Sequence, residues 1–91
     1  MILCKVIGSV WATRKDDALT GVKLMIVQRL DADGKEMEGS FVAADFVGAG
    51  IGEQVIVATG SSARIACHNK TAPIDATIVG IVDAVELADK R

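Results

Sequence analysis

Apolar and β-branched residues recur in five short runs along the chain, and the segments between them are rich in glycine, aspartate and serine. Runs of this length and composition, bounded by such residues, predict β-strands. The expected strands cover residues 2–11, 23–30, 40–44, 54–59 and 78–87. Gly8 interrupts the first strand, which is typical of a bend or bulge.

The segments between the runs predict turns, loops and one helix. Residues 12–21 are polar and predict a loop, whereas Asp33-Gly34 between the second and third runs is a strong hairpin signal. Ser61 and Ser62 follow a glycine, so we expect a short helix there with either serine as its N-cap. Residues 68–76 contain the only proline and are expected to be irregular.

Five strands with a single short helix between the fourth and the fifth place the chain in the mainly β class. This order predicts a small five-stranded β-barrel of OB-like outline. A length of 91 residues corresponds to one domain, so residues 1–91 are expected to fold as a single unit.

The apolar content exceeds what so small a domain can bury. Apolar residues make up 51% of the chain, nine glycines add to this, and aromatic residues contribute only 3%. The excess is therefore aliphatic. A domain of this size buries only about 60% of the surface of its unfolded chain. We expect the remaining aliphatic surface to form a subunit interface.

The charge balance argues against a nucleic acid partner, and the apolar pattern argues against a membrane span. Ten basic and twelve acidic residues give a net charge of −2, and the basic residues form no tract. The chain begins with a short apolar stretch that has neither the order of a signal peptide nor the length of a membrane span. We expect a cytosolic protein whose two cysteines are reduced thiols.

Three alternating glycines form the motif Gly48-Ala49-Gly50-Ile51-Gly52. A dinucleotide or phosphate loop needs a helix after its glycines, whereas here a strand is expected to follow. We therefore interpret the motif as a tight connection whose backbone needs positive φ angles or a close approach to another chain. Copies of such a loop could converge around a rotation axis, where little room exists.

The remaining side chains offer little catalytic or metal-binding chemistry. The soft metal ligands are Cys4, Cys67 and His68, which are fewer than the four of a structural zinc site. Adjacent residues of an extended segment point to opposite sides, so Cys67 and His68 are not aligned for nucleophilic catalysis. The acids near expected strand ends are Asp45, Glu53, Asp75 and Asp83. We expect no catalytic residue, no metal and no cofactor.

Several stretches, taken in order, resemble one known family over essentially the whole chain. They are GSVWATRK at residues 8–15, LTGVKL at 19–24, VAADFVGAGIGE at 42–53, GSSAR at 60–64 and DATIVGIVD at 75–83. The sequence resembles the EutN/CcmL family, the pentameric vertex proteins of bacterial microcompartment shells.

This resemblance implies a non-enzymatic shell protein that assembles as a cyclic homopentamer and caps the vertices of a polyhedral shell. Its partners would be hexameric microcompartment shell proteins, and its location would be a shell in the bacterial cytoplasm. Carboxysomes and the ethanolamine, propanediol and glycyl-radical compartments all use such proteins, and the resemblance does not select among them.

Two groups of candidate residues follow from motif position and charge. The candidate axis or pore loop is Gly48, Ala49, Gly50, Ile51 and Gly52, whose backbone amides could favour small anions. The candidate contacts between subunits or to neighbouring shell proteins are Arg14, Asp45, Glu53, Ser61, Ser62 and Arg64.

Two alternatives remain open from the sequence. The first is an OB-like module that binds single-stranded nucleic acid, with Trp11, Phe41 and Phe46 as the available stacking side chains. The second is a regulator that binds a small molecule or nucleotide.

Overall fold

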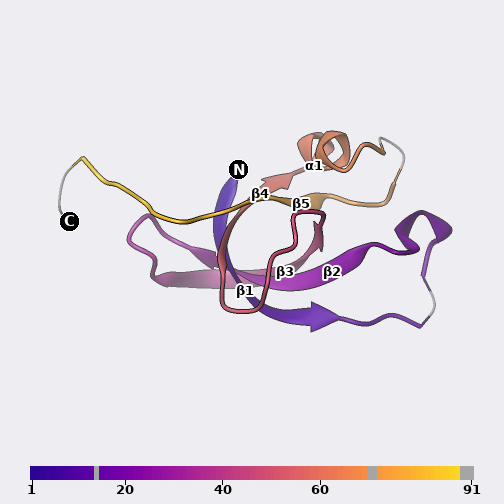
Figure 1. The fold of residues 1–91 in the computed structure, drawn as a ribbon, viewed down its shortest axis with the longest axis horizontal. Coiled ribbons are helices and arrows are strands. Elements are labelled where there is room, and N and C mark those ends of the chain that lie inside the picture. The colour runs from indigo at the N-terminus through magenta and orange to yellow at the C-terminus, as the bar shows by residue number, and fades with distance from the viewer. Residues whose placement is uncertain (14, 70–71, 89–91) are drawn as a thin grey trace.

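The computed structural model describes residues 1–13, 15–69 and 72–88 (Figure 1). The strands are β1 (Ile2–Val10), β2 (Lys23–Leu30), β3 (Glu36–Asp45), β4 (Gln54–Thr59) and β5 (Ala76–Ile81). The helical elements are α1 (Ser61–Ala66) and a short 3-10 helix, η1 (Asp17–Leu19). The mainly β class is confirmed, and η1 lies within the expected loop of residues 12–21.

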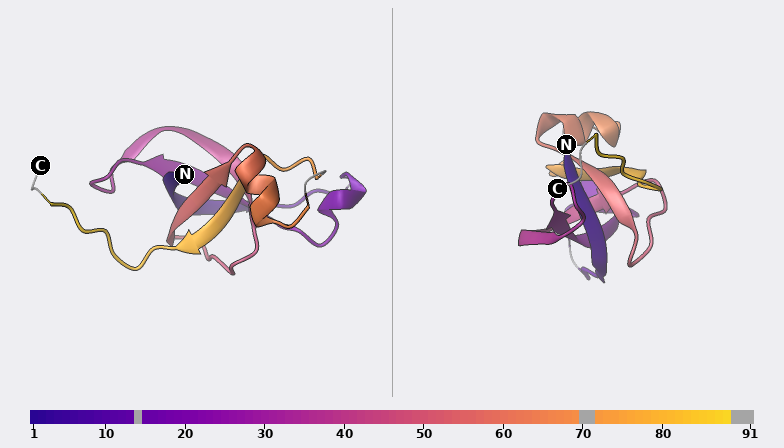
Figure 2. Two further views of the ribbon diagram at one scale, coloured as in Figure 1. Left: turned by 90° about the horizontal axis from the view of Figure 1, so that it is seen from above. Right: turned by 90° about the vertical axis from the view of Figure 1, so that its left-hand side faces the viewer.

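The five strands close into a barrel in the order β1-β2-β3-β5-β4, as Figures 1 and 2 show. Every neighbouring pair is antiparallel except β3 and β5, which run parallel. That parallel seam is short, because it joins only Ala44 to Thr77 and Asp45 to Ile78. The predicted five-stranded barrel is therefore confirmed.

Alternation along the strands places small and medium apolar side chains inside the barrel. The fully or nearly fully buried residues of this core are Cys4, Val6, Met25, Val27, Ala43, Ala49, Val55, Val57, Ala76 and Ile78. A second, smaller cluster joins α1 and the segment before β5 to the end of β3 through Ala44, Ala63, Ala72 and Ile74. The core is thin, as the chain length predicts.

The structure confirms two local predictions from the sequence, the irregularity at Gly8 and the hairpin at Asp33-Gly34. The register between β1 and β2 shifts between Val6 and Gly8, which confirms the predicted irregularity at the glycine. In the β2–β3 hairpin, Asp31 Oδ1 accepts hydrogen bonds from the amides of Asp33 and Lys35 at 2.9 and 3.0 Å. Gly34 has φ +84°, a conformation that disfavours residues with a Cβ.

The predicted last strand, residues 78–87, is wrong at both ends. β5 begins two residues earlier and ends at Ile81, because its partner β4 has only six residues and the pairing of Val55 with Ile81 nearly exhausts it. Val82 still donates to the Gln54 carbonyl at 2.8 Å. Residues 82–88, which we call the C-terminal arm, then leave the barrel in an extended path (Figure 2).

Other boundaries differ from the sequence prediction for identifiable reasons. The third strand begins at Glu36 rather than residue 40, because Gly39, at φ +109°, lies within the strand next to a register shift. The first strand ends at Val10, so Trp11 lies beyond it. The predicted serine cap is also wrong, since Gly60 occupies the N-cap of α1 and no side chain caps the helix. Neither helical element of the described ranges is long and apolar enough to cross a membrane.

Two methionines, Met25 and Met37, provide a matched test of the barrel core. Met25 is 1% exposed within the barrel and Met37 is 43% exposed on β3. Met25→Ala should lower the free energy of unfolding by about 2–5 kcal/mol because it removes buried methylene groups and leaves a cavity. Met37→Ala should change it by less than about 1 kcal/mol. Denaturant unfolding at one fixed protein concentration measures both, and equal losses would contradict this core assignment.

Candidate subunit interface

Large apolar side chains remain on the surface of the barrel, as the composition predicts. Those exposed by more than about a third are Met1, Ile7, Trp11, Met37, Val42, Phe46, Val47, Ile51, Ile56, Ile65, Ile81, Val85 and Leu87. Scattered single apolar residues are ordinary on a protein surface, whereas contiguous ones indicate contact with a partner. The strand register shows which of them are contiguous.

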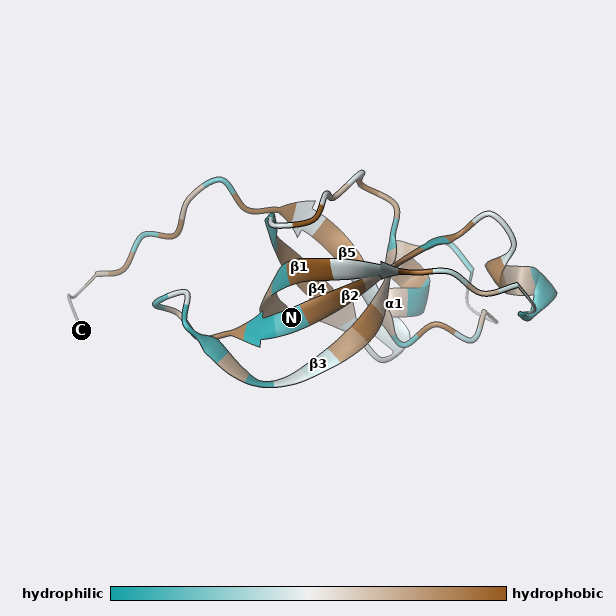
Figure 3. Cartoon of the chain, turned by 90° about the horizontal axis from the view of Figure 1, so that it is seen from below, coloured by the Kyte–Doolittle hydropathy of each residue, from teal (hydrophilic) through white to brown (hydrophobic). Residues whose placement is uncertain are grey.

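One apolar row crosses the outer face of β1, β2 and β3. Gly8 pairs with Ile26, and Ile26 pairs with Val42. Because Met25 and Val27 point into the core, the side chain of Ile26 points outward, and a Cβ on Gly8 would lie 3.5 Å from its Cδ1. Figure 3 shows β2 and β3 changing from hydrophilic near their hairpin to hydrophobic toward α1. Because Ile26 and Val42 point outward here, this end of the barrel carries apolar side chains on its outer face.

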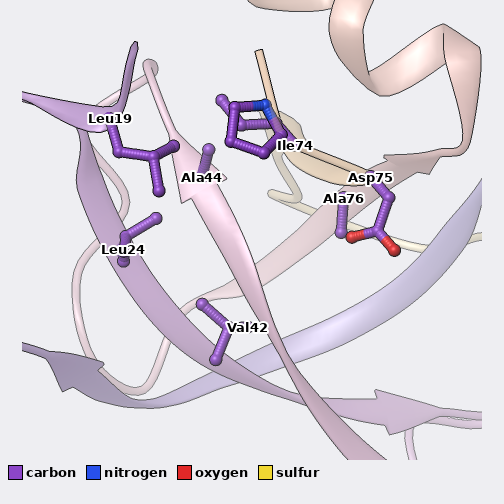
Figure 4. A pocket seen from close by; sticks show the side chains of 8 residues that line it. Leu19, Leu24, Val42, Ala44, Ile74, Asp75 and Ala76 are labelled. Atoms are coloured by element: carbon purple, nitrogen blue, oxygen red, sulfur yellow. The ribbon is translucent and has the colours of Figure 1, made fainter. Parts of the chain in front are cut away.

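A shallow hollow adjoins this row where β3 meets the segment before β5. It has a volume of about 170 Å³ and is lined by Leu19, Leu24, Val42, Ala44, Pro73, Ile74, Asp75 and Ala76. Figure 4 shows the apolar side chains of η1, β2 and β3 facing those of the segment before β5, with the Asp75 carboxylate to one side. Its size suits a single side chain rather than a cofactor.

A larger groove lies between the end of β1 and the start of β2. Its volume is about 450 Å³, and its lining residues are Ser9, Val10, Trp11, Ala12, Lys15, Gly21, Val22, Lys23 and Leu24. Trp11 is 94% exposed, so it lies outside the core of its own subunit. We call this surface the Trp11 groove.

The glycine motif forms the loop between β3 and β4, and its glycines serve the local backbone. Gly48 and Gly52 have φ angles of +80° and +93°, which disfavour any residue with a Cβ. Gly50 does not share this conformation. The structure therefore confirms the positive-φ interpretation at the first and third glycines of the motif.

Two predicted interface acids hold this loop from within the subunit. Asp45, whose side chain is fully buried, accepts hydrogen bonds from the amides of Val47 at 3.0 Å and Ala49 at 2.9 Å. Glu53 Oε1 accepts from the Gly50 amide at 2.6 Å. This role was not predicted from the sequence, although an aspartate just before a glycine-rich turn commonly accepts hydrogen bonds from amides a few residues on.

A lysine side chain pairs with the buried carboxylate of the loop. Lys23 Nζ lies 3.5 Å from Asp45 Oδ2 and donates to the Ala49 carbonyl at 3.0 Å. The buried carboxylate of Asp45 is thus paired as well as hydrogen-bonded, which buried charges require. Because carboxylates already occupy the amides of Val47, Ala49 and Gly50, few loop amides are left for the anion binding that the sequence suggested.

The other interface candidates lie on α1 or outside the described residues. Arg64 Nη1 donates to the Ile74 carbonyl at 3.3 Å and so ties α1 to the segment before β5. Ser61 and Ser62 are exposed in the first turn of α1. The predicted contact Arg14 lies outside the described residues. The candidates therefore form two groups, one at the glycine loop and one at α1, and their contact with another subunit stays a prediction.

The two cysteines are free thiols in different parts of the fold. Cys4 lies in the barrel core, where burial raises the pKa of its thiol against the smaller opposing influence of Arg29. Cys67 packs beside the second cluster, and its Sγ donates to the Arg64 carbonyl at 3.2 Å. Within residues 1–13, 15–69 and 72–88, no three potential metal ligands come together.

Comparison of nearly the whole chain with known protein families shows which family it belongs to. The family model described as ethanolamine utilisation protein EutN/carboxysome matches residues 1–83. The chain belongs to the EutN/CcmL family. The resemblance seen in the sequence motifs is thereby confirmed.

Curated relatives of this EutN/CcmL chain carry names of shell proteins. The carboxysome shell vertex protein CcmL of Synechocystis sp. is 51% identical over 88 residues, which cover 97% of this chain and 88% of the relative. The microcompartment shell vertex protein GrpN of Rhodospirillum rubrum is 49% identical and covers 94% of this chain and 97% of the relative. Carboxysome and other microcompartment relatives thus match to similar extents.

Solved structures of the family have the same fold. The structure titled as the GrpN pentameric microcompartment shell protein from Rhodospirillum rubrum superposes with a TM-score of 0.88 at 47% identity, covering 98% of this chain and all of the other. A carboxysome subunit, CcmL, gives a TM-score of 0.92 at 51% identity and covers 97% of this chain and 92% of the other. The barrel seen here is therefore the family fold.

Removing the carboxylate of Asp45 should destabilise the glycine loop. Asp45→Ala leaves the amides of Val47 and Ala49 without their acceptor, and the free energy of unfolding should fall by about 1–3 kcal/mol. Asp31→Ala is the matched control, because Asp31 also accepts two amides but in an exposed turn where water replaces it. Denaturant unfolding measures both variants. If Asp45→Ala lowers the free energy of unfolding no more than Asp31→Ala does, the loop does not depend on the Asp45 carboxylate.

Proposed function

We propose that this protein is a non-enzymatic shell component that forms cyclic homopentamers and caps the vertices of a bacterial microcompartment. The observation that carries this proposal is the similarity of nearly the whole chain to a pentameric shell protein, at 47% identity. The apolar surface of the isolated barrel supports it, because such a surface requires a partner. The proposed unit is one domain spanning residues 1–91.

A pentamer at a shell vertex allows the shell to close. A sheet of hexameric proteins is flat, and closing it into a polyhedron requires units with fivefold symmetry. A head-to-tail interface between identical subunits closes into a ring when its rotation divides a full turn. We propose hexameric shell proteins as the neighbours of this ring, inside the bacterial cell.

The structure favours this function over single-stranded nucleic acid binding. Stacking of bases requires aromatic side chains on a basic surface. Phe41 is only partly exposed and packs against the barrel core, which leaves Trp11 and Phe46 as the exposed aromatic side chains among the described residues. The net charge of −2 offers no compensating attraction.

Oligomeric state is the direct test of the proposed function. Native mass spectrometry, supported by light scattering at several concentrations, should show a dominant pentamer that persists on dilution. Co-expression with hexameric shell proteins should then yield closed particles, and the same hexamers alone should yield sheets, tubes or incomplete shells. A stable monomer at every concentration would reject the proposal.

The glycine loop is proposed to lie at the fivefold axis or at a subunit seam, with Asp45, Glu53, Ser61, Ser62, Arg64 and Arg14 as polar contacts nearby. Gly50 is suited to this test, because its φ is not positive and a Cβ there would meet the Glu53 side chain, whose Oε1 at 3.2 Å has to shift slightly. Gly50→Gln should therefore leave the barrel folded.

The expected effect of Gly50→Gln is on assembly. Five copies of the added side chain would crowd the axis or seam, so the concentration at which the pentamer dissociates should rise severalfold. Far-UV circular dichroism checks the fold, and native mass spectrometry measures the dissociation. An unchanged pentamer that also passes small solutes as before would place the loop away from the axis and the seams.

A further inference from the structure

The C-terminal arm has little to hold it to its own barrel. In the described part of the chain, the bond from Val82 to the Gln54 carbonyl is the last backbone hydrogen bond between arm and barrel. Further along, Val85 is 47% exposed and Leu87 is 41% exposed. Both border an open hollow beside Leu3 and the tip of the β2–β3 hairpin. An extended segment with exposed aliphatic side chains and unpaired backbone is suited to docking on another chain.

The Trp11 groove complements the arm in both hydrophobicity and charge. Its apolar walls are Val10, Trp11, Val22 and Leu24, and its lining includes Lys15 and Lys23 but no acid. The arm carries Asp83 and Glu86 between its apolar residues and, over residues 82–88, no basic residue. An acidic, aliphatic segment therefore matches an apolar groove with a basic rim.

Of the two lysines, Lys15 is the one available to an incoming acid. Lys23 already lies 3.5 Å from Asp45 Oδ2. Lys15 is exposed and its Nζ donates to the Ala12 carbonyl at 3.2 Å, and across the described residues it forms no ion pair with a carboxylate. The neighbouring Asp16 is engaged with the Ala18 amide at 2.8 Å.

The arm and the groove lie at opposite ends of the subunit. The molecule measures 46 Å along its longest axis and 23 and 22 Å across. Figures 1 and 2 show the arm leaving at the end opposite the loop between β1 and β2 that contains the groove. The arm therefore cannot reach the groove of its own subunit. Two different complementary patches at opposite ends are what a head-to-tail ring requires.

We propose that the C-terminal arm of each subunit lies in the Trp11 groove of the next subunit around the ring. Val85 and Leu87, two residues apart on an extended chain, point to one side and pack against Trp11 and Leu24. Glu86 points to the other side, toward Lys15 at the rim. Seven extended residues span about 23 Å, which is enough to cross a subunit boundary. This inference rests on the cyclic assembly proposed above and identifies one of its contacts.

A charge exchange tests the proposed pairing. Lys15→Glu and Glu86→Lys should each raise the concentration at which the pentamer dissociates by up to about fivefold per interface, and combining them should restore the wild-type value. Lys5→Glu is the control, since Lys5 is exposed on β1 outside the groove. Leu87→Ala and Trp11→Ala should each weaken the pentamer, and the two effects should not add when combined.

Cross-linking reports the position of the arm directly. Cysteines introduced by Leu87→Cys and Ala12→Cys, with Cys67→Ser, should form under mild oxidation a covalent ladder that ends at the pentamer. The pair Leu87→Cys and Ala32→Cys instead reports an arm folded over its own hairpin, because both residues border that hollow. A cross-linked monomer from the second pair, with no ladder from the first, would overturn the inference.

The outcomes separate this inference from the proposed function. If the wild-type protein is a monomer, the cyclic assembly fails and the arm contact fails with it. If the wild type is a pentamer whose dissociation is unchanged in Lys15→Glu, Glu86→Lys and Leu87→Ala, the pentamer stands and the arm is not part of its interface. Far-UV circular dichroism of every variant confirms that the barrel is folded.

Discussion

The narrow interior of a five-stranded barrel is the constraint on which the rest of this structure depends. Its inward positions hold residues such as Cys4, Val6, Ala43 and Val57, and larger side chains there are few. The sequence nevertheless contains 51% apolar residues. What the interior cannot hold must face outward, so the outer row that includes Ile26 and Val42 and the Trp11 groove are consequences of barrel size. The same constraint supports the oligomer proposed above.

Features with a local physical cause could be predicted from the sequence. The Asp-Gly hairpin, the irregularity at Gly8 and the positive φ angles of Gly48 and Gly52 all depend on a few neighbouring residues. The fourth strand, Gln54–Thr59, was predicted with both ends correct because polar or glycine-containing segments bound it on each side. The family followed from the order of several motifs rather than from any of these elements.

Features that depend on distant residues could not be predicted in this way. The end of β5 is set by the length of β4, and nothing in the apolar run from residue 78 to 87 indicates where its partner stops. The burial of Asp45 depends on Lys23, which is 22 positions away, so the sequence could only show an acid beside a strand. The groove around Trp11 arises from the relative position of two chain segments, which periodicity does not encode.

The short parallel seam between β3 and β5 has a consequence for how the barrel opens. Only two residue pairs close it, and one of them includes Thr77, whose Oγ1 also donates to the Ala63 carbonyl of α1 at 2.9 Å. Arg64 adds a second tie between the helix and the segment before β5. Because the same few residues close the barrel and hold the helix, separating the seam would release both together. The seam and α1 therefore form one cooperative unit of local unfolding, through which solvent deuterium would reach the amides that pair β3 with β5 before those between β1 and β2.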